Sequence, residues 1–315
     1  MKGSKLSLNV EDYPGGIALW GSALAVYDTT GFDFVPGIHV HARKVVNQEK
    51  QIDSTFDKVN VLYKGQAVSF DKNAAISYLS ASIANQNMTY LECPKCGNAH
   101  LDMNKYSVNI HKRHLCSICG CYFYSKDLCI GNPIIKSKEV FGDAQIHRKK
   151  VKPNRILDIN QKDFPYGISI WGTANAFLWT APRPEEDGIH VHAYKENNLE
   201  PTIDETFDSV VVDGISLNVE QVRIYMMQKT LPYLNNRIVA LKCQICGNDF
   251  FDIGKDAFTP NNVHLCSKCN HVKRTRKKVV SNPIINTFLQ LHSFTNLPMK
   301  INDIQTLYPA LVDWE

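Results

Sequence analysis

The chain has 315 residues, of which 44% are hydrophobic, 10% aromatic and 21% charged. These fractions are typical of globular domains and exclude disordered, collagen-like and coiled-coil chains. The formal net charge of +4 is too small to indicate a nucleic-acid partner by itself. Because domains average about 150 residues, the length predicts two of them, each large enough to bury a core.

Cysteine usage bears on the cellular compartment. Eight of the ten cysteines form four Cys-x-x-Cys pairs, which indicates metal binding in a reducing compartment rather than a secreted disulfide scaffold. The first residues, Met1 to Gly16, lack the apolar segment of a secretory signal. No run of about 18 apolar residues occurs either. We therefore expect a cytoplasmic chain that does not span a membrane.

The sequence contains an internal duplication. Several segments recur at an offset of 151 residues and the cysteine pairs recur at an offset of 150, so one single-residue gap aligns the two halves. A period this long indicates a duplicated domain and not a solenoid, whose repeats span about 20–50 residues. The recurring segments are Tyr13–Ala23 with Phe164–Ala174, Gly37–Ala42 with Gly188–Ala193, Ile52–Asp57 with Ile203–Asp208, and Asn132–Ile135 with Asn282–Ile285.

Each half is predicted to contain about four strands and one helix, followed by a cysteine-bearing segment. A buried strand comes first, and an alternating strand, a hairpin and a helix follow it. Strands followed by a helix and a small metal module predict an α+β fold, here as a tandem duplication of a strand-rich unit. The expected elements are strands 17–26 and 37–43, hairpin 59–68 and helix 73–84, and then strands 168–177 and 188–194, hairpin 210–217 and helix 219–231.

The domain boundaries follow from the repeat. A polar, basic stretch between the halves predicts an exposed linker. At the C-terminus, Phe288, Leu291 and Phe294 recur at helical spacing, which predicts a short helix that packs on one half. We place the first repeat at 1–135 (strand-rich region 1–92, ribbon 93–121), the linker at 136–160, the second repeat at 161–285 (strand-rich region 161–242, ribbon 243–271) and the tail at 286–315.

Each half carries Cys-x2-Cys, then nineteen residues, then Cys-x2-Cys. Two such knuckles supply four thiolates in a tetrahedron, which suits Zn²⁺, although a rubredoxin-like iron centre uses the same ligands. Each segment resembles the large and functionally mixed class of zinc ribbons, which implies a metal-stabilised loop and no specific activity. Four-cysteine sites leave no open coordination position, so we expect two structural zinc ions. The predicted ligands are Cys93, Cys96, Cys116, Cys119, Cys243, Cys246, Cys266 and Cys269.

Histidines in both ribbons allow two interpretations. His111 and His114, and His264 and His271 in the second half, form either a mixed ligand set with cysteine or a polar surface on the ribbon tip. Four cysteines already satisfy the metal, so we expect the surface. His114 and His264 each stand two residues before a ligand cysteine, where a hydrogen bond to a thiolate is expected.

A second metal-binding pattern lies on the alternating strands. Two histidines at i and i+2 leave the same face of a strand, and paired imidazoles are common ligands of Zn²⁺ and Fe²⁺. In each half, one aspartate would join the two histidines and complete a metal site with open coordination positions, as catalysis requires. The other interpretation is that the histidines line a polar face and form hydrogen bonds to backbone carbonyls. On the preceding strands, we expect Trp20 and Trp171 to be core residues. The candidates are His39, His41, Asp53 and Asp57, and His190, His192, Asp204 and Asp208.

Two functions are consistent with these patterns. The preferred hypothesis is a module that binds nucleic acid or a protein partner through basic ribbon faces. The alternative is a metal-dependent hydrolase that uses the histidine pairs with aspartate. Two bound metal ions per chain favour the first, and three or four favour the second. The expected phosphate contacts are Lys112, Arg113, Lys273, Arg274, Arg276, Lys277 and Lys278.

Overall fold

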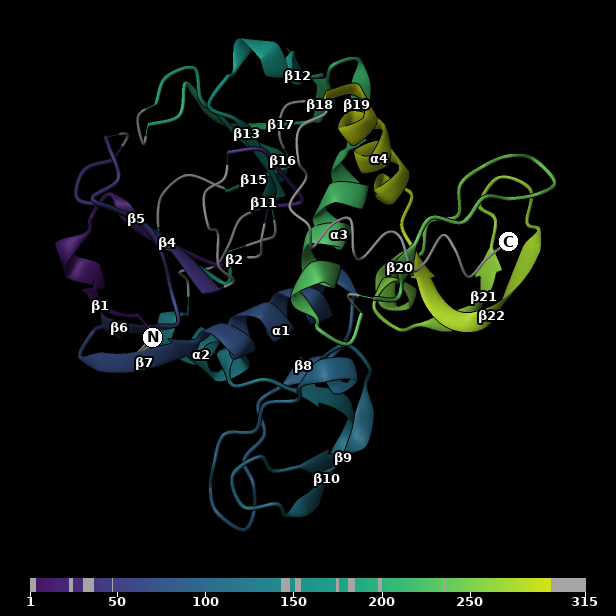
Figure 1. Ribbon diagram of the computed structural model, residues 1–315. Coiled ribbons are helices and arrows are strands. Elements are labelled where there is room, and N and C mark those ends of the chain that lie inside the picture. The colour runs from purple at the N-terminus through teal and green to yellow at the C-terminus, as the bar shows by residue number, and fades with distance from the viewer. Residues whose placement is uncertain are drawn as a thin grey trace. The chain divides into compact units, whose positions relative to one another are not determined.

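The computed structural model describes residues 4–22, 25–30, 37–46, 48–142, 148–150, 154–173, 176–180, 185–197, 200–234 and 236–295. The chain forms two compact, strand-rich units, each with helices (Figure 1). Each unit also carries one four-cysteine cluster. The predicted α+β class and the duplicated layout are confirmed. Unit 1 comprises Met1–Ala23, Val35–Lys149 and Ala174–Glu185, and unit 2 comprises Leu24–Phe34, Lys150–Thr173 and Glu186–Glu315.

The elements of the two units correspond one to one over most of their length. Unit 1 contains β1 (Lys5–Asn9), η1 (Val10–Asp12), β2 (Gly16–Ser22), β4 (Gly37–Arg43), β5 (Ile52–Phe56), β6 (Lys58–Tyr63), β7 (Gln66–Asp71), α1 (Lys72–Ile83), β8 (Met88–Thr89), η2 (Asn104–Ser107), β9 (His111–Leu115), β10 (Tyr122–Gly131), α2 (Ile134–Phe141) and β14 (Leu178–Trp179). Unit 2 contains β3 (Tyr27–Asp28), β12 (Ile156–Ile159), η3 (Gln161–Asp163), β13 (Ile168–Gly172), β16 (Ile189–Ala193), β17 (Ile203–Phe207), β18 (Ser209–Val212), β19 (Ile215–Asn218), α3 (Val219–Thr230), β20 (Ile238–Val239), η4 (Gly254–Ala257), β21 (Asn261–Leu265), β22 (Val272–Ser281) and α4 (Ile284–Thr295). Two short strands, β11 (Arg148–Lys150) and β15 (Glu185–Asp187), complete the described elements.

A four-stranded antiparallel sheet carries the repeated histidine motif in each unit. Its strand order is β14-β2-β4-β5 in unit 1 and β17-β16-β13-β3 in unit 2. Successive side chains of a strand point to opposite faces. One face of the unit 1 sheet is therefore apolar: Ile17, Leu19, Ile38 and Val40 are fully buried, and α1 packs against β2 and β4. The histidines lie on the opposite face.

The outer strand of each sheet comes from the other half of the sequence. β14 pairs with β2 in unit 1, and β3 pairs with β13 in unit 2. Phe177 N donates to Leu19 O at 2.9 Å, and Val26 N donates to Ile170 O at 2.8 Å. The expected strands 17–26 and 168–177 are therefore interrupted, because their later residues join the other sheet. Neither sheet is complete from one repeat alone.

The predicted hairpins turn where the sequence indicates. Lys64 and Gly65 have φ values of 48° and 77°, and Asp213 and Gly214 have values of 49° and 79°. Positive φ at both central residues defines a type I′ turn, whose twist matches that of the flanking strands. The second strand of each hairpin leads directly into the predicted helix, α1 or α3.

The repeated Asn-Pro-Ile-Ile segment ties two helices together in each unit. Asn132 is fully buried; its Oδ1 accepts from Ile134 N at 3.0 Å, and its Nδ2 donates to Ala74 O at 3.0 Å. The amide of Asn282 makes the same two contacts, with Ile284 N and Gln221 O. One side chain thus starts the last helix of each unit and fixes it to the preceding one.

The segments expected as linker and tail contain regular structure. Residues 136–160 include most of α2 and all of β12, which pairs in parallel with β18. α4 covers the beginning of the tail, where Phe288 and Leu291 are buried, and Phe288 packs on Tyr225. Residues from 296 onward lie outside the described residues. Across the portion of the chain that the structure describes, no helix is long and apolar enough to cross a membrane.

Candidate metal centres

The two predicted cysteine sets converge, one in each unit. Cys93 Sγ lies 3.6 Å from Cys119 Sγ, and Cys96 Sγ lies 3.7 Å from Cys116 Sγ. A tetrahedral Zn²⁺ with Zn–S bonds of about 2.3 Å places its sulfurs about 3.8 Å apart, so the spacing fits zinc. In the second set, the pairs Cys243–Cys269 and Cys246–Cys266 are both separated by 3.6 Å. These are two probable structural zinc sites.

Backbone amides favour the thiolate form of the first cysteine in each knuckle. Gly97 N donates to Cys93 O at 2.8 Å, which closes the first knuckle, and Gly97 has a φ of 69° that suits glycine. Burial opposes ionisation of Cys93, but the amides of Lys95 and Cys96 outweigh it and lower the pKa of this thiol to about 6. The thiolate is the form that binds metal.

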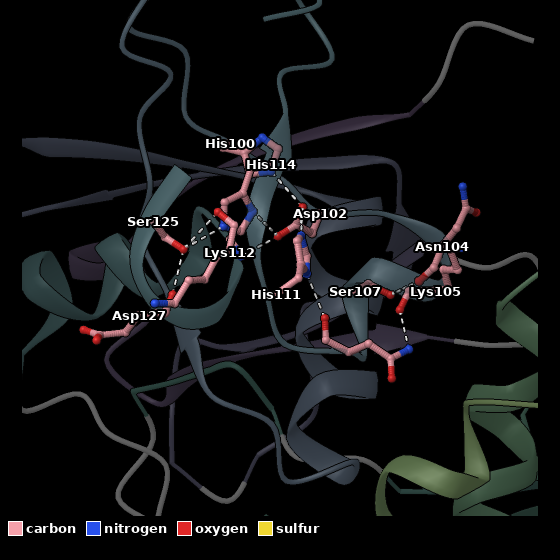
Figure 2. A network of polar contacts seen from close by, with 12 residues as sticks. His100, Asp102, Asn104, Lys105, Ser107, His111, Lys112, His114, Ser125 and Asp127 are labelled. Atoms are coloured by element: carbon pink, nitrogen blue, oxygen red, sulfur yellow. Dashed lines mark hydrogen bonds and ion pairs between the residues drawn. The ribbon is translucent and has the colours of Figure 1, made fainter. Parts of the chain in front are cut away.

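The ribbon histidines do not belong to the cysteine sites. In the first ribbon they surround one carboxylate (Figure 2). Asp102 Oδ1 lies 2.8 Å from His100 Nε2 and 3.2 Å from His111 Nε2. Asp102 Oδ2 lies 3.1 Å from His114 Nδ1 and accepts from Gly131 N at 2.7 Å. Three imidazole nitrogens and one backbone N–H therefore surround this one carboxylate.

This network is buried, so the expected surface position of His114 is wrong. His100, Asp102 and His114 are at most 5% exposed, and His114 Nε2 contacts Ser125 Oγ at 3.0 Å instead of a thiolate. Burial opposes the charge of Asp102, but hydrogen bonds from His100 and Gly131 hold its pKa below the usual range. The three buried side chains are of metal-ligating types and could hold a metal ion, and Gly131 N already donates one hydrogen bond to the carboxylate.

The second ribbon keeps only a portion of this network. Asp252 Oδ2 accepts from Ser281 N at 2.7 Å and lies 3.0 Å from His264 Nδ1. Phe250 and Asn261 stand where the first ribbon has His100 and His111. The shared aspartate–histidine pair ties the end of β22 to the hairpin, which is a structural role. The two extra histidines are specific to the first ribbon.

A different kind of site lies on the open face of the unit 1 sheet. His39 and His41 are adjacent on one face of β4, and Asp53 on β5 is directly opposite His41. His39 Nε2 lies 2.9 Å from His41 Nε2, and these atoms lie 3.2 and 3.1 Å from Asp53 Oδ1. The three atoms form a nearly equilateral triangle. Ligands about 2.1 Å from one metal ion are about 3.0 Å apart in an octahedron and about 3.4 Å apart in a tetrahedron.

The donor set of this triangle favours a cation. A carboxylate only accepts hydrogen bonds, and a neutral imidazole carries one N–H and one lone pair. If both Nε2 atoms donated to Asp53, two N–H groups would face each other across 2.9 Å. His39 Nδ1 contacts Thr55 Oγ1 at 3.1 Å, a partner that suits the tautomer with its lone pair on Nε2. A metal ion would satisfy all three acceptors together.

The charge states suit metal binding. Burial lowers the pKa of His41 to about 3, against the influence of Asp53, so the imidazole is neutral near pH 7. Burial also opposes ionisation of Asp53, but the close contacts with His39 and His41 and the positive charge of Lys50 outweigh it and hold its pKa below the usual range. Neutral imidazole and ionised carboxylate are the ligating forms.

Unit 2 repeats this arrangement. His190 Nε2 lies 3.0 Å from His192 Nε2, and both lie 3.2 Å from Asp204 Oδ1. His190 Nδ1 contacts Thr206 Oγ1 at 3.1 Å. The side chains of the two triads are 18–39% exposed, so solvent and small solutes reach them. The same distances therefore recur on separate sheets with different flanking sequences.

The structure separates the two aspartates proposed in each half. Asp57 accepts from Ser4 N at 2.9 Å and pairs with Lys72, and Asp208 accepts from Asn154 N at 3.3 Å. Asp57 directly precedes β6 and Asp208 directly precedes β18, and neither side chain joins a triad. Asp53 and Asp204 join the histidines because each lies directly across the strand pair from one of them.

Two neighbours of the triads were not predicted. The core position expected for Trp20 is wrong: it is partly exposed and lies edge-on to His41, with ring centroids 4.6 Å apart. Trp171 packs in the same way on His192. The signal was present, since Trp20 alternates with the buried Leu19 and must point to the histidine face. The threonines likewise stand two residues after the ligand aspartates.

The basic residues expected to contact phosphate lie on the ribbon hairpins. Lys112 and Arg113 are exposed on β9, and the remainder belong to β22, where all but the partly exposed Lys273 are exposed. Searches of family models, curated proteins and solved structures found no match to this chain.

Proposed function

We propose that each unit binds a catalytic divalent transition-metal ion through its two histidines and one aspartate, and that this ion activates water for hydrolysis. The observation that carries the proposal is the convergence of Nε2, Nε2 and Oδ1 within 3.2 Å in both units. The two four-cysteine sites then act as structural zinc sites.

Three ligands on one sheet face leave the other side of the ion open. A catalytic zinc has three protein ligands and a water in its fourth position, and it lowers the pKa of that water to about 7. The partial exposure of the triads gives a substrate access to this position. The indole of Trp20 or Trp171 beside one imidazole provides an apolar wall. The same ligand set also suits Fe²⁺ and oxygen chemistry, so the identity of the metal decides the reaction class.

Metal content tests the proposal directly. The purified full-length chain should contain four metal ions by elemental analysis. The double variant His39→Ala/His41→Ala should contain three, and a variant that also carries His190→Ala/His192→Ala should contain two. Hydrolysis of nitrophenyl phosphate monoesters, phosphate diesters and carboxylic esters should fall with each lost ion.

Matched controls come from the aspartates outside the triads. Asp57→Asn and Asp208→Asn should keep four ions and full hydrolysis, whereas Asp53→Asn and Asp204→Asn should each lose one ion. Only two ions in the unaltered chain would overturn the proposal. Iron at the triads would replace hydrolysis with oxygen chemistry.

Nucleic-acid binding is a second candidate function, favoured by where the charge lies. The first ribbon together with the rest of its hairpin, Cys93–Gly131, holds five basic and two acidic residues. The corresponding segment of the second half, Cys243–Ser281, holds seven basic and three acidic residues. The ribbons thus carry a net +7, although the whole chain carries +4. Concentrated positive charge on two small modules attracts a polyanion. Salt-dependent binding of oligonucleotides by the full chain tests this candidate.

A further inference from the structure

One face of the first ribbon combines exposed rings with positive charge. β9 and β10 are antiparallel, with Tyr122 opposite Leu115 and Tyr124 opposite Arg113. Phe123 and His114 point to the other face and are buried. The alternation therefore leaves Tyr122, Tyr124, Leu115 and Arg113 on one outer surface, which we call the tyrosine face.

The exposure of these side chains is unusual for residues of their type. Tyr124 is 71% exposed, Tyr122 54% and Leu115 49%. The guanidinium carbon of Arg113 lies 3.9 Å from the ring centroid of Tyr122, a cation–π contact that places the charge beside the ring. Tyr122 and Tyr124 are two residues apart on one strand, about 6.8 Å along it. Rings at this spacing offer two adjacent platforms.

Building on nucleic-acid binding as the second candidate function, we propose that the tyrosine face binds single-stranded nucleic acid by base stacking. Aromatic side chains and arginine guanidinium planes stack on unpaired bases, while basic side chains follow the phosphates. Arg113 and Lys126 are exposed on the same two strands and supply that charge. The bases of a duplex are stacked on each other and cannot reach such rings, so the face selects single strands.

The second ribbon lacks the rings and has more charge. Val272 and Arg274 occupy the positions of Tyr122 and Tyr124, and β22 carries five basic residues between 273 and 278. This ribbon therefore contributes attraction to phosphates without stacking. The chain thus provides its own comparison between a stacking and a purely electrostatic surface.

Fluorescence anisotropy with labelled 12-nucleotide single-stranded DNA, single-stranded RNA and duplex DNA tests the inference on the full-length chain. Single strands should bind more tightly than duplex at every salt concentration. Tyr124→Ala should weaken single-strand binding by about 5- to 150-fold, because stacking of one base contributes about 1–3 kcal/mol. Tyr124→Phe should bind like the unaltered chain, since it keeps the ring. The DNA and RNA arms identify which strand is preferred.

Controls separate stacking from charge and from folding. Tyr166→Ala removes a tyrosine that is 46% exposed outside the ribbons and should change nothing. Arg274→Ala should weaken binding of all three probes and flatten the salt dependence, whose slope is about −0.7 per phosphate contact on single strands. All variants should keep both ribbon zinc ions.

The outcomes distinguish nucleic-acid binding by the chain from base stacking on the tyrosine face. If the unaltered chain binds no oligonucleotide at low salt, both claims are overturned. Salt-dependent binding that ignores strandedness and is unchanged in Tyr122→Ala/Tyr124→Ala would keep the charged ribbons and overturn the tyrosine face.

Discussion

The two triads should differ in metal affinity because one of them has a lysine beside it. Lys50 Nζ lies 2.5 Å from Asp53 Oδ2, and both side chains are partly exposed. Pro201 stands at the equivalent position of the second half, so this lysine is specific to the first half. The first site must therefore bind a cation next to the ammonium group of Lys50.

The size of this effect follows from the distances. A metal ion about 2 Å from Asp53 Oδ1 would lie about 5 Å from Lys50 Nζ. Charges of +2 and +1 at that distance repel by about 1.7 kcal/mol in water. Partial burial strengthens the repulsion, while salt weakens it, so we expect about 1–2 kcal/mol. This corresponds to a Kd about 5- to 30-fold weaker at the first site.

Two reciprocal substitutions test the argument. Lys50→Met removes the ammonium group and keeps most of the aliphatic stem, so it should tighten the first site. Pro201→Lys should weaken the second site if the new ammonium reaches Asp204. Each variant is dialysed against buffered free Zn²⁺ and the bound ions are counted. The background His190→Ala/His192→Ala leaves only the first triad to titrate.

The zinc affinities of the two triads in the unaltered chain and in Lys50→Met test the electrostatic argument. The unaltered chain should fill its two open sites in separate steps, and Lys50→Met should merge them. Equal affinities in the unaltered chain, or no tightening in Lys50→Met, would refute the electrostatic reasoning. Raising the ionic strength should reduce the difference in the unaltered chain and not in Lys50→Met.

Four further outcomes are expected. Cys93→Ser should lose one zinc ion by elemental analysis because three ligands remain, whereas Cys121→Ser, at a cysteine outside the set, should lose none. Asp102→Asn should speed zinc release from the first ribbon to a chelator. The buried groups around it lose an ionised acceptor, which should lower the stability of the ribbon by about 2–4 kcal/mol. An unchanged release rate would contradict the role of the network. A fragment of residues 1–150 should form a dimer by light scattering, because two copies can complete each other's sheets, and a folded monomer would argue against the exchange. Burial raises the pKa of Tyr27 well above its usual value, so unit 2 should be fully stable below about pH 10 and lose stability as the pH rises further. Tyr27→Phe should melt with a flatter alkaline dependence.

The sequence determined the features that depend on local chemistry. Two cysteine knuckles at fixed spacing predict the same ribbon wherever they occur, because the ligands and the turn geometry are close in the chain. The Asp213-Gly214 turn and the helix after it are local for the same reason. The pairing of His39 with His41 also follows from strand periodicity alone.

Only the tertiary structure decided which distant residues meet. Asp53 and Asp57 both follow His41 within 16 residues, and strand register placed Asp53 in the triad and Asp57 beside Lys72. The exchange of β3 and β14 depends on how the chain passes from one sheet to the other, which no local pattern encodes. The cluster around Asp102 needs the end of β10 to approach the loop before η2. Periodicity fixes the face on which a side chain lies, whereas register and topology fix its neighbours.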